Sequence, residues 1–171
     1  MSSTVISTLR TGLGAAIATV FNDSGVIAAV GGVVPNVYEA KSSDGWFLMN
    51  LPGGEGVVYA YAGKTLVGRG PLGARKNRLT FDFSIALCSG NWADPVGATY
   101  TAADLAEFLM GSPSLPDSTP CLNDIVIGRI GDDEIFLRYA GEVTKMAPNS
   151  TQQGGRIALV QSWRSFPEVA L

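Results

Sequence analysis

The chain has 171 residues, of which 46% are hydrophobic and 16% are charged, and its formal net charge is −3. This length allows one sizeable core, so we expect a single domain over residues 1–171. The small negative charge gives no general attraction for nucleic acid or an acidic membrane, and the absence of histidine removes the usual near-neutral general base and the commonest zinc ligand. These features argue against polyanion binding and against many classes of enzyme.

The spacing of apolar residues predicts a helix over residues 4–21. The side chains that recur at steps of three and four, and so form one stripe, are Ile6, Leu9, Leu13, Ile17 and Val20. No basic region precedes this run and Arg10 interrupts it, so we do not expect a secretion signal. Because no uninterrupted apolar stretch reaches about 18 residues, we also predict no membrane span.

The stretch from residue 24 to residue 54 is harder to interpret. Asn22 to Gly25 should end the first helix, and residues 26–34 are apolar but broken by glycines, which leaves their conformation open. A short strand is predicted over residues 46–51, before a Pro-Gly-Gly sequence. Residues 24–54 could therefore form an inserted loop or arm.

Two strands are predicted next. Residues 56–62 alternate in a way that suits a strand covered on at least one face. In residues 78–88 the apolar and polar side chains alternate strictly, which is typical of an antiparallel strand with one buried face. The side chains that would point to the core are Leu79, Phe81, Phe83, Ile85 and Leu87.

The remainder predicts a helix and three further strands. Residues 101–111 form a short amphipathic helix that begins with a threonine cap and ends at a glycine. Residues 125–130 and 135–143 suggest a hairpin, and residues 156–166 a final strand. The predicted fold is α+β, a mainly antiparallel sheet packed against the N-terminal helix and the helix near residues 101–111.

Two glycine-rich motifs imitate nucleotide-binding sites. Gly63-Lys64-Thr65 resembles the end of a phosphate-binding loop, but Val58 stands where that loop needs a glycine, so we predict a plain turn. Gly68 to Gly73 matches a dinucleotide fingerprint in form only, because a proline and a strand follow instead of a helix. We therefore predict no cofactor.

No other motif indicates catalysis or metal binding. Asp132-Asp133-Glu134 lacks the alternating ligand pattern of a calcium loop and predicts a solvated turn. Cys88 and Cys121 have no CxxC pairing and no histidine partner, so we interpret them as small buried hydrophobic residues. The sequence predicts no catalytic, cofactor-binding or metal-binding residues.

Basic residues gather in one segment of the chain. Five of the 12 lysines and arginines lie there, namely Lys64, Arg69, Arg75, Lys76 and Arg78. No acidic residue occurs between Glu55 and Asp82. The segment is either a solvated loop or an extended arm that docks on an acidic partner or lines a passage for DNA.

The succession of elements resembles a family of phage proteins. The segments that carry this likeness are the helix over 4–21, GVVYAYA with its loop, RLTFDFSIALCSG, AADLAEFLMG, a proline-containing loop, the hairpin and RIALVQSWRSF. This order is similar to that of the tail terminators (tail-completion proteins) of long-tailed bacteriophages, which include minor tail proteins of Mu-like phages. Residues 24–54 are longer and more apolar than that family leads one to expect, and their role stays open.

The resemblance implies a structural virion protein, usually a hexameric ring, that caps the tail tube and joins it to the head. Its partners would be further copies of itself, the tail tube protein and the head–tail connector protein, with DNA able to pass through the ring without sequence-specific binding. The protein would assemble in the host cytoplasm and reside in the tail or neck of the virion. The alternatives are another neck or tail component, such as a connector or tube subunit, and a small ligand-binding domain that uses residues 63–73.

Overall fold

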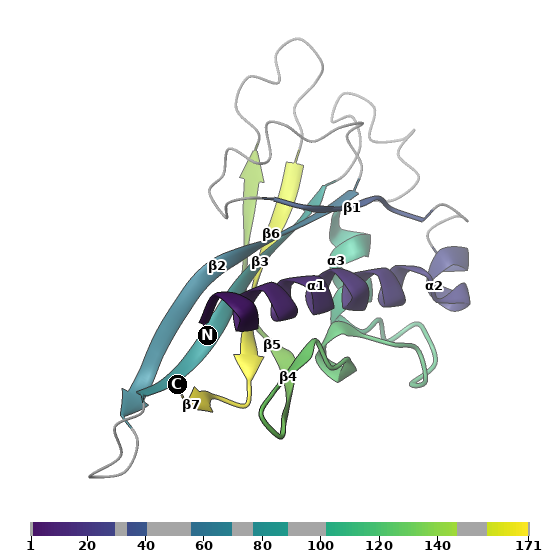
Figure 1. Cartoon of the computed structure of the whole chain (residues 1–171). Coiled ribbons are helices and arrows are strands. Elements are labelled where there is room, and N and C mark those ends of the chain that lie inside the picture. The colour runs from purple at the N-terminus through teal and green to yellow at the C-terminus, as the bar shows by residue number, and fades with distance from the viewer. Residues whose placement is uncertain are drawn as a thin grey trace.

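A computed structural model describes residues 2–29, 34–40, 56–69, 77–88, 102–146 and 157–170. The helices are α1 (Ser2–Phe21), α2 (Ser24–Ala29) and α3 (Ala102–Met110), with a short 3-10 helix at Leu122–Asp124. The strands are β1 (Val37–Glu39), β2 (Gly56–Arg69), β3 (Asn77–Cys88), β4 (Gly128–Ile130), β5 (Asp133–Met146), β6 (Ile157–Phe166) and β7 (Val169–Ala170). Figure 1 shows α1 lying across a curled sheet, which confirms the predicted α+β fold.

The strands form one sheet in the order β1-β2-β3-β6-β5-β4, and β7 pairs with β3 beside this path. All pairs are antiparallel except that of β1 with β2. The longest pairings are those of β2 with β3 and of β5 with β6, and each contains a register shift. The mainly antiparallel sheet that the sequence predicts is therefore confirmed.

The main core lies between the helices and one face of the sheet. Five side chains of α1 are fully buried, namely Leu9, Leu13, Ile17, Val20 and Phe21, so the predicted stripe is confirmed apart from the half-buried Ile6. The inward residues of β3 meet this stripe, as their alternation predicts. Leu105 and Leu109 bring α3 into the same core.

Helix α1 also has the length and composition of a membrane span. Residues 3–21 are apolar enough to cross a bilayer despite Arg10, so the prediction from uninterrupted apolar runs is too strict. The structure gives another reason for this composition, because the apolar stripe of α1 packs on the sheet. An ion pair between Arg10 and Glu39 further links α1 to β1. The core helices of other proteins also have this length and apolar composition, so these properties of α1 are only weak evidence that it spans a membrane.

The predicted turn at Gly63-Lys64-Thr65 is wrong. Strand β2 continues through these residues to Arg69, and the register shifts between Tyr61 and Gly63. Gly63 has a φ of +123°, a backbone conformation that favours glycine, so the glycine serves a β-bulge rather than a turn. The strand that the sequence ends at residue 62 is consequently much longer.

The other differences concern short elements. The predicted stop at Asn22–Gly25 does end α1, but α2 begins within it at Ser24 and takes in residues 26–29, whose conformation the sequence leaves open. Asp23 Oδ1 caps α2 by accepting hydrogen bonds from the N–H groups of Gly25 (2.9 Å) and Val26 (3.2 Å). Strand β4 is shorter than the strand predicted over 125–130, while β1 and β7 are absent from the prediction. The strand predicted over 46–51 lies outside the described residues.

Candidate assembly surface

Strands β2 and β3 extend as a long hairpin beyond the part of the sheet that the helices cover (Figure 1). We call residues 63–69 and 77–80 the hairpin arm. Its strands are paired, with Leu66 opposite Leu79 and Arg69 opposite Asn77, and the register shifts between Leu66 and Gly68. Residues 70–76, which connect the two strands, lie outside the described part of the chain. The paired backbone gives the arm a defined direction.

The arm exposes apolar side chains and a strand edge. Leu66 is 58% exposed and Val67 is 49% exposed. On its outer side β2 pairs with β1 only from Val57 to Tyr59, and no other described strand pairs with the rest of that edge. Exposed apolar side chains on an uncovered strand edge are typical of a surface that another chain covers.

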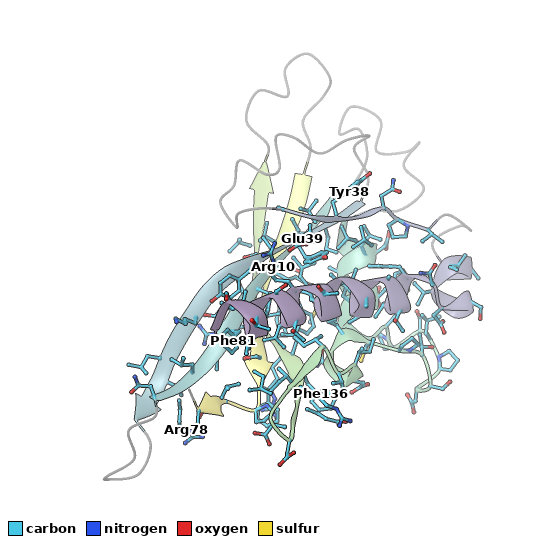
Figure 2. The ribbon with its side chains drawn as sticks, viewed as in Figure 1. Arg10, Tyr38, Glu39, Arg78, Phe81 and Phe136 are labelled. Atoms are coloured by element: carbon cyan, nitrogen blue, oxygen red, sulfur yellow. The ribbon has the colours of Figure 1, made fainter. Side chains whose placement is uncertain are left out.

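The predicted basic residues belong to this arm. Lys64 is exposed on β2, Arg69 ends β2, and Arg78 lies near the start of β3. Arg78 Nη2 lies 2.5 Å from Glu168 Oε2, and Figure 2 shows Arg78 on the arm, away from Arg10 and Glu39. Arg75 and Lys76 lie outside the described residues. The structure thus places three of the five on one hairpin.

Polar contacts around Asp82 connect the base of the arm to the sheet. The hydroxyl of Thr65 on β2 donates a hydrogen bond to Asp82 Oδ2, and Arg164 Nε on β6 lies 3.2 Å from Asp82 Oδ1. Beside them, the Phe81 N–H donates to Ser165 Oγ at 2.8 Å in a buried position. Three strands are therefore joined where the arm leaves the sheet. The sequence alone does not single out this role of Asp82.

The opposite side of the sheet has a second free strand edge. Strand β4 pairs with β5 only as far as Ile135, and beyond it no described strand covers the outer edge of β5. The turn that precedes this edge is acidic, and Asp132, Asp133 and Glu134 are exposed. Arg129 pairs with Glu134 at 2.6 Å, and among the described residues Asp132 and Asp133 have no salt bridge. We call Asp132, Asp133 and Glu134 the acidic turn, and its exposure fits the predicted solvated turn.

A buried glutamine lies where β6 meets β5. Gln161 is fully buried, its Oε1 accepts a hydrogen bond from Trp163 Nε1 at 3.0 Å, and its Nε2 donates to Glu142 Oε1 at 3.3 Å. Trp163 is one of the largest fully buried side chains. An open cavity of about 320 Å³ lies next to this network and has Glu107 and Glu142 in its lining. The buried amide thus satisfies the indole N–H of the core tryptophan.

Replacing Gln161 with alanine is expected to lower the free energy of unfolding by about 2 kcal/mol, because it leaves the buried indole N–H of Trp163 without its acceptor and opens a cavity. Chemical denaturation followed by tryptophan fluorescence measures this change. Ser162→Ala is the matched control, since Ser162 is exposed and next in sequence. Equal stability of the two variants would show that the indole needs no such partner.

The described residues show no group suited to metal chemistry and no activated thiol. Among them, no cluster of three or more histidine, cysteine, aspartate or glutamate side chains could hold a metal ion. Cys121 is half-buried, and burial raises the pKa of its thiol, with a further contribution from its hydrogen bond to Asp124 Oδ2 at 3.1 Å. A raised pKa favours the less nucleophilic protonated thiol. The side chain of Cys88 lies outside the described residues.

Burial also raises the pKa values of three tyrosines above their ordinary value. For Tyr59 the carboxylate of Glu39 adds to the effect of burial, and for Tyr61 that of Asp82 does so. The pKa of Tyr139 is raised by burial and by Glu142. These phenols remain protonated near neutral pH and supply no base.

Comparisons with known proteins show a likeness of structure but none of sequence family. No family model matches the chain, and no curated protein matches it. A solved structure described as the virion of a native gene transfer agent (GTA) particle contains a similar chain, with 16% sequence identity and a TM-score of 0.48. The match covers 92% of this chain and 94% of that chain.

Proposed function

We propose that this chain is a structural, non-enzymatic virion protein of a phage-like particle, a tail terminator that works as one domain. In this proposal several copies form a ring, hexameric as in the family that the sequence resembles. The ring caps the tail tube, meets the head-side connector and lets DNA pass without reading its sequence. The order of the segments from residue 4 to residue 166 supports the proposal.

The hairpin arm is the observation that carries the proposal. It extends away from the core, exposes Leu66 and Val67, and has a strand edge with which no described strand pairs beyond Tyr59. An isolated soluble domain gains nothing from such an arm, because exposed apolar strands invite association. The arm is best explained as a contact between subunits of an assembly.

The arrangement of free edges favours a ring over a simple dimer. The uncovered edges of β2 and β5 lie on opposite sides of the sheet and carry different sequences. Contact between two different surfaces is heterologous, and repetition of such a contact gives a closed ring or an open filament. A terminator needs the closed form.

The mass and shape of the assembly test this function. Size-exclusion chromatography with light scattering should show a concentration-dependent oligomer, and negative-stain electron microscopy should show rings of uniform diameter. Long cylinders would instead identify a tube subunit. A protein that stays monomeric at high concentration, both alone and with purified tail tubes, would refute the proposal.

A further inference from the structure

Charge is separated along the chain. Between Glu55 and Asp82 there are five basic residues and no acidic one. Residues 104–134 contain seven acidic residues and one basic residue, Arg129, which is paired with Glu134. The charges of these two regions have opposite sign and partly cancel in the net charge of −3.

The fold places these two regions on opposite sides of the sheet. The basic region is the hairpin arm on β2 and β3, and the acidic turn joins β4 to β5 beyond β6. In Figure 1 the arm and the acidic turn lie apart from each other, toward the same end of the strands. Lys64 and Arg69 therefore lie away from the acidic turn of their own copy, whereas the acidic turn of a neighbouring copy can approach them.

The strand directions make the two free edges compatible. Strand β2 is antiparallel to β3, β3 to β6 and β6 to β5, so β2 and β5 run in opposite directions. If β2 of one copy extends the sheet of the next at β5, the new pair is antiparallel, and the far end of the arm comes to the end of β5 that begins at Asp133. That end carries the acidic turn.

We infer that the hairpin arm of one copy lies along the free edge of β5 in a second copy, with its basic residues against the acidic turn. This rests on the proposed self-assembly and names the surfaces that would produce it. Arg69, at the far end of β2, would come nearest to Asp132 and Asp133, which form no salt bridge with the described residues of their own subunit. Leu66 and Val67 would be covered by the same contact.

The apolar side chains favour a protein partner over DNA. A DNA contact would depend on the arm's charges alone, since phosphates are recognised by cationic and polar groups. Half-exposed Leu66 and Val67 gain from burial against another protein, and a strand edge gains hydrogen bonds from another strand. The acidic turn supplies the complementary charge within the same sequence.

Charge reversal on each surface tests the inference in the full chain. The arm variant is Lys64→Glu with Arg69→Glu, and the turn variant is Asp132→Lys with Asp133→Lys. Each alone should weaken self-association at least about tenfold, as measured by sedimentation velocity, because like charges then face each other. Mixing the two variants should restore rings, since every contact between alternating copies again joins opposite charges. A variant whose arm and turn are both reversed should also assemble.

Controls separate this contact from general effects of charge and folding. Asp117→Lys with Asp124→Lys makes the same charge change on exposed residues outside the acidic turn and should leave association unchanged. Circular dichroism and recovery in the mixture show that the variants fold. Rings that persist in the arm variant, or a loss of binding to short duplex DNA with no loss of rings, would overturn the inference and leave the proposed function intact. A wild-type chain that never forms rings would overturn both.

Discussion

Replacing Gly12 with alanine should destabilise the fold by about 3 kcal/mol or more, although alanine is the better helix former. A Cβ at Gly12 would lie 1.6 Å from the carbonyl oxygen of Ile127 and 2.6 Å from its carbonyl carbon. Both atoms are backbone, so no side-chain rotation relieves the clash. Helix α1 would have to move away from the segment before β4, which would separate residues of the main core.

Thr11→Ala is the matched control for this variant, because Thr11 is exposed on the same turn of α1. Urea denaturation followed by circular dichroism gives the two free energies of unfolding. The control should be as stable as the wild type or slightly more so, since helix propensity favours alanine over threonine. A Gly12→Ala protein with at least wild-type stability would mean that α1 and Ile127 are not as close as the structure has them.

Elements with strong periodic patterns could be predicted from the sequence, and elements made by long-range pairing could not. The stripe of α1 and the alternation of β3 each bury a continuous set of apolar residues, so their patterns are unambiguous. Strands β1 and β7 have three and two residues and exist because β2 and β3 lie beside them. No local pattern in the sequence predicts such pairings.

The sequence predicted the basic residues of the candidate surface but not the long strand that carries them. Clustering of basic residues identified Lys64, Arg69 and Arg78, because charge can be counted along the chain. An extended arm was one of two alternatives, but the continuation of β2 past residue 62 was not predicted, since Gly63 looks like a turn and is in fact a bulge within β2. Leu66 and Val67 follow directly after that glycine, and their apolar character was the available signal that the strand continues.

Removing the outer part of the arm should abolish assembly while leaving the fold intact. Leu66 and Leu79 lie directly opposite each other, so residues 67–78 can be replaced by Asn-Gly, a two-residue turn that suits an antiparallel hairpin. None of the described residues in the deleted stretch belongs to the main core. The loss of the ion pair between Glu168 and Arg78, whose side chain is 56% exposed, should cost about 1 kcal/mol of unfolding free energy.

The truncated protein should therefore melt cooperatively near the wild-type temperature and run as a monomer at concentrations where the wild type forms rings. Light scattering and thermal unfolding of the same preparations measure both effects. A full-length control, Leu66→Ser with Val67→Ser, keeps the strand edge and the charges but removes the apolar contact, so it should assemble more weakly than the wild type and more strongly than the truncation. Rings formed by the truncated protein would show that subunits meet through another surface, because every charge, apolar side chain and strand edge beyond Leu66 would then be dispensable.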